Sequence, residues 1–145
     1  MKTNTVYPRS VHEKYLGVVQ LARTIDKATM KATGSLGEYD YDCPMDQALF
    51  HEFGIDGKKL FYIAKYGADG DIEGYVKPLI AKKNETDLNR FNLATLTGKP
   101  TGDSLMQFED LRAQIAPTRP DVTTWPDLLD LDEGRAVSQR ETDEV

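Results

Sequence analysis

Apolar side chains recur every three or four positions along most of this chain, in stretches that end at glycine or proline. The longest stretch runs from Val11 to Thr33, and Gly34 follows it as a C-terminal stop. Its apolar stripe consists of Val11, Tyr15, Val18, Val19, Ala22, Ile25 and Thr29. No stretch alternates apolar and polar residues in the way that predicts a paired strand. The spacing therefore predicts an all-α fold that opens with one long helix.

Capping residues and helix stops predict the shorter helices that follow. Pro44 favours the first turn of a second helix, and Pro78 either ends or kinks a fourth. The expected N-caps of the later helices are Asp56, Asp69 or Asp71, Thr86, Asp103 or Ser104, and Thr124. The expected stops are Gly54, Gly67, Gly98, Pro117 and Gly134. We predict a single-domain bundle of about six to seven helices, with an ordered polar loop after the first.

The length and charge distribution suit one domain with an acidic end. A chain of 145 residues typically forms one domain, which we place at residues 1–135. Residues 1–10 are expected to be extended. Of the net charge of −6, the stretch 127–145 carries −5, and residues 136–145 lack a core-forming pattern. We therefore expect a disordered acidic tail at 136–145.

Several classes of protein are disfavoured by composition. The basic residues do not cluster as nucleic-acid binding requires, and no apolar run approaches the ~20 residues of a membrane span. The single cysteine, Cys43, cannot form an internal disulfide or a cysteine-based zinc site, which is typical of the cytoplasm. Phosphate-loop and dinucleotide motifs are missing from the sequence. The expectation is a cytoplasmic protein without nucleic-acid or membrane partners, cofactor or metal.

The loop over residues 34–47, G-S-L-G-E-Y-D-Y-D-C-P-M-D-Q, is the densest polar stretch between two expected helices. Glycines permit sharp turns, which would return Glu38 and Tyr39 over the end of the first helix. The loop is then either an ordered cover over the core, with Tyr39 packed inward and Glu38 in solvent, or part of a binding site.

Asp26 falls inside the apolar stripe of the first helix, where a carboxylate needs a partner. One interpretation is structural: Asp26 caps another helix or pairs with Arg23. The other is functional: Asp26 acts as a general base, or anchors a ligand, with Glu38 as the second carboxylate.

Four further residues are candidate ligand contacts. Arg23 and Lys27, one turn apart, would clamp an anionic group, and Tyr39 would donate a hydrogen bond. The alternative for Lys27 is a solvated helix edge. Asp46 is most simply a carboxylate in the first turn of the second helix, where the helix dipole stabilises a negative charge. Cys43 is expected to be buried and inert.

The motifs just described resemble a known family. The loop G-E-Y-D-Y-D-C-P-M-D-Q, the preceding R-T-I-D-K-A, an early P-R-S and the closing T-T-W-P-D-L-L-D-L-D-E-G-R are similar to bacterial proteins called domain of unknown function 5069. The resemblance covers about Pro8 to Arg135 and implies a small helical cytoplasmic bacterial protein, without implying an activity. Its signature positions here are Arg23, Asp26, Lys27, Glu38, Tyr39, Pro44 and Asp46.

Two functions follow from these features. The first is a small-molecule site between the first helix and the 34–47 loop, with Asp26 and Glu38 as its acid–base pair if the protein is an enzyme. The second is a non-catalytic module that binds a partner protein or forms a homodimer, which the acidic tail and the motif-rich final helix favour.

Overall fold

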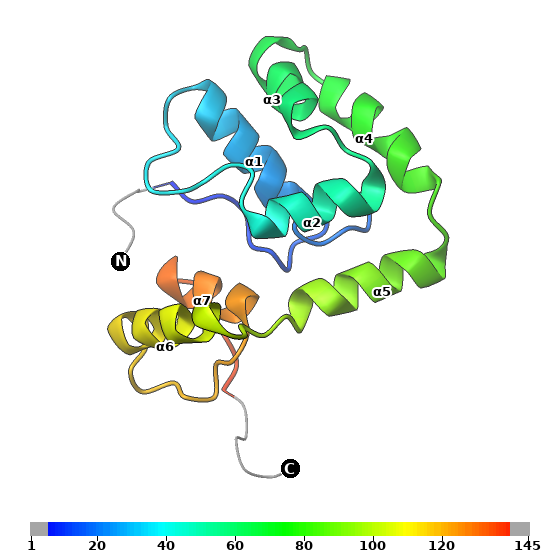
Figure 1. Ribbon diagram of the computed structural model, residues 1–145. Helices are drawn as coiled ribbons and strands as arrows, with labels where there is room; N and C mark the ends of the chain where they lie inside the picture. The colour runs from blue at the N-terminus through cyan, green and yellow to red at the C-terminus, as the bar shows by residue number, and fades with distance from the viewer. Residues whose placement is uncertain (1–5, 140–145) are drawn as a thin grey trace.

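Seven helices make up the regular structure of the described residues, 6–139, in the computed structural model (Figure 1). They are α1 (Leu21–Ala32), α2 (Pro44–Phe53), α3 (Gly57–Tyr66), α4 (Asp71–Ala81), α5 (Glu85–Leu96), α6 (Asp103–Ile115) and α7 (Trp125–Asp132). The all-α prediction is confirmed, and so is the polar loop between the first two helices. Of the tail expected at 136–145, residues 140–145 lie outside the described residues, as do residues 1–5 of the extended start expected at 1–10. None of the described helices is both long enough and apolar enough to cross a membrane.

The predicted first helix is wrong over its N-terminal half, because α1 begins only at Leu21. Residues 11–20 instead form consecutive turns, in which Leu16, Gly17 and Gln20 have positive φ angles of 52°, 83° and 71°. The side chain of Asn92 on α5 accepts from the Val19 N–H (3.1 Å) and donates to the Gly17 carbonyl (2.9 Å). A helix cannot pass through left-handed residues, so the turn persists although its valines are buried as the spacing predicted.

Two other helix ends differ from the sequence prediction. Asn84 caps α5 by accepting from the Asp87 N–H at 2.8 Å, so that helix begins before the expected cap, Thr86. The fourth helix continues through Pro78 to Ala81. Pro78 has no N–H to donate to the Gly74 carbonyl, and because both residues are exposed, water can satisfy that carbonyl.

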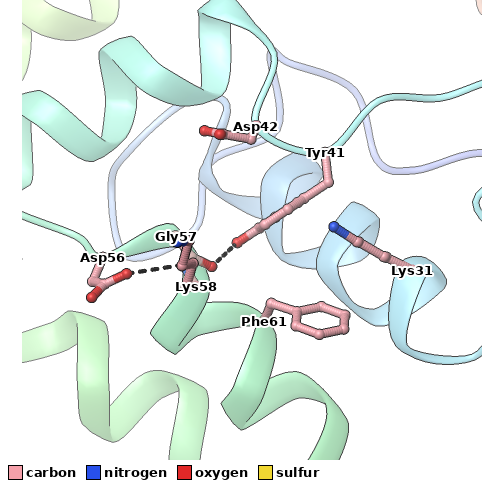
Figure 2. Close-up of a pocket in the computed structure, with 7 residues that line it drawn as sticks. All are labelled: Lys31, Tyr41, Asp42, Asp56, Gly57, Lys58 and Phe61. Atoms are coloured by element: carbon pink, nitrogen blue, oxygen red, sulfur yellow. Dashed lines mark hydrogen bonds between the residues drawn. The ribbon is translucent and has the colours of Figure 1, made fainter.

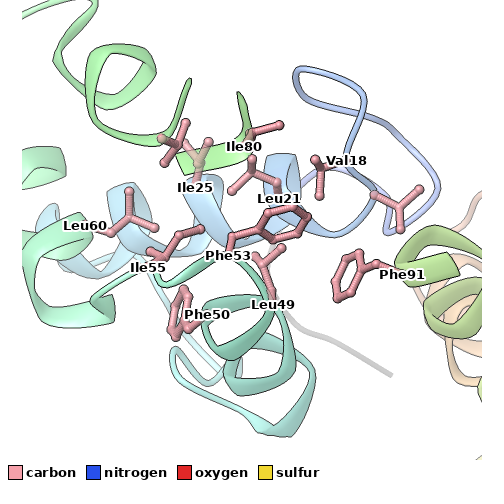
Figure 3. Close-up of a cluster of buried hydrophobic side chains, with 12 residues drawn as sticks. Val18, Leu21, Ile25, Leu49, Phe50, Phe53, Ile55, Leu60, Ile80 and Phe91 are labelled. Atoms are coloured by element: carbon pink, nitrogen blue, oxygen red, sulfur yellow. The ribbon is translucent and has the colours of Figure 1, made fainter. Parts of the chain in front are cut away.

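Apolar side chains form two separate clusters. The first apolar cluster lies among α1–α5 and the turn before α1 (Figure 3). Its buried members are Val18, Val19, Leu21, Ile25, Leu49, Phe50, Phe53, Ile55, Leu60, Val76, Ile80 and Phe91. The second apolar cluster, Phe108, Val122 and Leu128, lies between α6 and α7 and is covered by Trp125. Figure 1 shows α5 leading from the group α1–α4 to the pair α6 and α7.

Candidate functional site

Asp26 is held by Arg9, a partner that the sequence analysis missed. Its carboxylate accepts from the Arg9 backbone N–H (2.8 Å) and from guanidinium nitrogens Nε and Nη2 (3.0 Å each). The hydrogen bond to Asp26 is the main cause that raises the pKa of Arg9. The Asp26 side chain is 27% exposed, so it is less buried than its position in the apolar stripe indicated. The expected pairing with Arg23 is wrong, and Asp26 fastens the N-terminal segment to α1.

Arg23 instead reaches the end of α7. Its two terminal nitrogens donate to the Glu133 carboxylate at 3.0 and 2.7 Å, and Tyr39 donates its hydroxyl to the same carboxylate at 2.8 Å. Arg135 also pairs with Glu133. Burial opposes ionisation of Glu133, yet the Arg23 hydrogen bonds and charge hold the pKa of Glu133 below its usual value. Arg23 and Tyr39 thereby bind a buried carboxylate of the protein itself.

Lys27 and Asp46 form a second buried ion pair, with 2.7 Å between the ammonium and a carboxylate oxygen. Asp46 also accepts from the Thr24 hydroxyl (2.6 Å) and the Gln20 amide (3.0 Å). Burial opposes its ionisation, but the charge and hydrogen bond of Lys27 lower the pKa of Asp46. The expectation that Lys27 lies on a solvated helix edge is wrong, because its ammonium is enclosed by the carbonyl oxygen of Asp40 and by Asp46.

The remaining loop residues are divided between interior and surface. Glu38 is exposed, whereas Tyr39 is buried against the Arg23 guanidinium, 5.5 Å from its ring centroid. Cys43 is half-buried at the N-cap of α2, with its sulfur 3.4 Å from the Lys27 ammonium, so the expectation that it is a core residue is wrong. Most residues expected at a ligand site therefore contact protein partners in the interior, and the role of Asp26 with Glu38 as an acid–base pair stays a prediction.

A cavity of about 530 Å³ lies beside this interior network, between the last turn of α1, the 34–47 loop and the start of α3 (Figure 2). Its lining consists of Lys31, Tyr41, Asp42, Asp56, Gly57, Lys58 and Phe61. The aromatic rings of Tyr41 and Phe61 lie 6.4 Å apart, and the Lys31 ammonium lies 5.5 and 5.1 Å from their respective centroids. Figure 2 shows that ammonium directed into the space between the two rings.

Several polar groups of the cavity are held in place by the fold. The Tyr41 hydroxyl donates to the Gly57 carbonyl at 2.6 Å, and burial, followed by the charges of Asp46 and Asp42, raises the pKa of Tyr41. Asp56 Oδ1 accepts from the backbone N–H of Lys58 at 2.9 Å as the N-cap of α3. The phenol therefore stays protonated at neutral pH, and the Asp56 carboxylate has a fixed orientation.

Asp42 brings the buried network into contact with the cavity wall. Its backbone has a positive φ of 72°, an uncommon conformation for a residue with a side chain. The Asp42 N–H donates to Asp46 Oδ2 at 3.0 Å, and that oxygen is the one paired with Lys27. Lys27 and Asp46 therefore hold the backbone of the lining residue Asp42, and they do not line the cavity themselves as expected.

The cavity residues were only partly visible in the sequence. Tyr41 and Asp42 belong to the loop that was singled out, but Lys31 gave only the signal of a helix-terminal cation. Lys58 and Phe61 carry no local signal of a site, because the approach of α3 to α1 brings them there. Among residues 6–139, no group of three His, Cys, Asp or Glu side chains is arranged to hold a metal ion.

Comparison with known proteins identifies a family without an assigned activity. The family model described as Domain of unknown function (DUF5069) matches residues 5–135. No curated protein matches the sequence.

Proposed function

The chain belongs to this family of unknown function, and we propose that it binds a small zwitterionic molecule in the cavity between α1, the 34–47 loop and α3. The observation that carries the proposal is the lining of that cavity. Two lysines, Lys31 and Lys58, and two aspartates, Asp42 and Asp56, line it together with the aromatic pair shown in Figure 2.

The charges of the lining favour a ligand that carries both signs. An anionic group of the ligand pairs with the Lys31 ammonium beside the two rings, and an amine pairs with the Asp42 carboxylate. A ligand with a single charge can pair with wall charges of only one sign, so it gains fewer ion pairs than a zwitterion. The volume of about 530 Å³ lies within the usual range for small-molecule sites.

The aromatic walls favour an apolar portion on the same ligand. Phe61 and Tyr41 are both half-buried, so a ligand that covers their rings removes apolar surface from water. A compact amino acid with an aromatic or branched side chain combines the two requirements. Chemistry on such a ligand by Asp26 and Glu38 is a separate proposal, and the Arg9 hydrogen bonds to Asp26 favour a structural role for that carboxylate.

A thermal-shift titration with three related probes tests the proposal. Phenylalanine carries both charges, 3-phenylpropionate keeps only the carboxylate, and phenethylamine keeps only the amine. We expect phenylalanine to raise the melting temperature more than either relative, because a ligand that binds only the folded state stabilises it. Lys31→Gln and Asp42→Asn should each abolish that difference, whereas Lys99→Gln, an exposed change between α5 and α6, should preserve it.

Two outcomes would count against the site. The first is the absence of any response to phenylalanine and to the other amino acids at millimolar concentration. The second is a response that is equal in the parent protein and in Lys31→Gln, since that would place the binding elsewhere.

A second candidate function is a non-catalytic interaction module, of which the expected homodimer is one form. The observation in its favour is the exposure of Tyr62 and Tyr66 on α3, at 62% and 64%. Light scattering on the full chain at increasing concentration distinguishes a dimer from a monomer. A mass that stays that of the monomer would show that Tyr62 and Tyr66 do not form a dimer contact.

A further inference from the structure

The outer face of α3 combines exposed tyrosines with lysines. Tyr62 and Tyr66 lie one turn apart with ring centroids separated by 4.9 Å, and most of each side chain is in solvent. Lys59 precedes Tyr62 by three residues and Lys65 lies between the tyrosines, so the four residues share a broad face of the helix. We refer to Lys59, Tyr62, Lys65 and Tyr66 as the α3 ridge.

The positive charge of the α3 ridge is not neutralised within the described part of the chain. Between residues 6 and 139, no carboxylate lies within ion-pair distance of the Lys59 or Lys65 ammonium. The ammoniums lie instead near aromatic rings, with Lys59 4.8 Å from the Tyr75 centroid and Lys65 5.3 Å from the Tyr66 centroid. Helix α3 has three lysines and no acidic residue, in a chain whose net charge is −6.

We propose that the α3 ridge docks a short acidic segment of a partner protein. Charge complementarity is the argument: the ridge presents unpaired ammoniums beside exposed rings, and a segment with glutamates and an apolar side chain satisfies both. The acidic residues Asp56, Asp69 and Asp71 flank the helix, so the favourable surface is about one helix of ten residues long, or roughly 15 Å.

The same charges disfavour a nucleic acid as the occupant. A nucleic acid carries a regular row of phosphates that extends beyond the ridge and meets the flanking aspartates, and the net charge of −6 repels it at longer range. A peptide places its charges only where the lysines lie. None of the four ridge residues lines the cavity, and Lys58, the lysine of α3 that does, stays unchanged in the test.

Fluorescence anisotropy with a labelled Glu-rich peptide of about ten residues, containing two leucines, tests the proposal on the full chain. The same peptide with Gln for every Glu, and an oligothymidylate of equal charge, are the comparison probes. We expect saturable binding of the acidic peptide that weakens at high salt. Lys59→Gln with Lys65→Gln should weaken it about fivefold, since two exposed ion pairs of about 0.5 kcal/mol each are lost.

A matched control separates the position of the charge from its amount. Lys82→Gln with Lys99→Gln removes two exposed lysines elsewhere, so the net charge changes equally, and affinity should stay within about twofold of the parent. Tyr62→Ala with Tyr66→Ala should weaken binding without changing charge. Equal weakening in the two lysine variants, tighter binding of the oligothymidylate, or no saturable binding would each overturn the proposal.

Discussion

Two side chains of helix α1 form buried ion pairs with different parts of the chain. Lys27 pairs with Asp46, 19 positions away, within the region of the first apolar cluster. Arg23 pairs with Glu133, 110 positions away, at the C-terminal end of α7. The two pairs have similar lengths of 2.7 Å and similarly buried side chains. The two pairs differ in what they join. The Lys27–Asp46 pair fixes the first turn of α2 to α1, and the Arg23–Glu133 pair fixes the helix α1 of the first apolar cluster to the end of α7 in the second.

Polar contacts are concentrated where the two clusters meet. Besides Arg23 and Glu133, the Arg135 guanidinium donates to the Pro8 carbonyl, and His12 lies 3.0 Å from Asp130. Burying a charge raises the free energy of the folded state unless its partners are in place. The stability that these contacts give therefore depends strongly on how the two clusters are positioned. Arg23, Lys27, Tyr39 and Asp46, which carry the family resemblance, therefore hold parts of the fold together, and the ligand that we propose would contact the neighbouring cavity instead.

The largest effect is expected from Glu133→Gln. This change keeps the size of the side chain but leaves Arg23 without its buried counter-charge and removes a partner of Arg135. The free energy of unfolding should fall by about 4 kcal/mol. Urea unfolding followed by circular dichroism measures the loss, and Trp125, the only tryptophan, reports the second apolar cluster by its fluorescence.

The two signals also test what the Arg23–Glu133 pair joins. In Glu133→Gln, the fluorescence transition should precede the transition in helix content, whereas in the parent they should coincide. Coincident transitions in both proteins, with a loss below about 1 kcal/mol, would show that Arg23 does not hold the two clusters together.

A smaller loss, about 3 kcal/mol, is expected from Asp46→Asn. Asparagine still accepts hydrogen bonds from Thr24 and Gln20, but the buried Lys27 ammonium loses its counter-charge. Because Asp42 depends on Asp46, binding of a zwitterion in the cavity should weaken as well. Calorimetric titration with phenylalanine at a temperature where the variant is folded measures that effect. Unchanged affinity would show that the loop keeps its shape without the ion pair.

The helices were predictable because their signals are local. Asp56 caps α3 and Gly54 ends α2 as their positions in the sequence indicated, since a cap contacts only the next turn. The turn before α1 was not predictable, because Asn92 stabilises it from 73 and 75 positions away. Apolar spacing correctly indicated burial there, but it does not distinguish a helix from turns that bury the same valines.

The burial of charged side chains was also only partly predictable from the sequence. Asp26 was singled out because it interrupts an apolar stripe, whereas Asp46 resembled an ordinary first-turn carboxylate and Glu133 a residue at a helix end. The structure makes Asp46 and Glu133 the more deeply buried of the three. Burial of a charge depends on partners brought together by the tertiary fold, and residue spacing within one helix carries no information about them.

The smallest effect is expected from Asp26→Asn. The Arg9 side chain is 39% exposed and the Asp26 side chain 27%, so water screens their pairing, and the loss of stability should be about 1 kcal/mol or less. Phenylalanine should raise the melting temperature of this variant as much as that of the parent, because Asp26 does not line the cavity. If Asp26 is instead the general base or ligand anchor considered from the sequence, the response should disappear while the fold persists. A double variant with Arg9→Gln sharpens the test: its loss of stability should be close to that of either single change, because each already removes the same interaction.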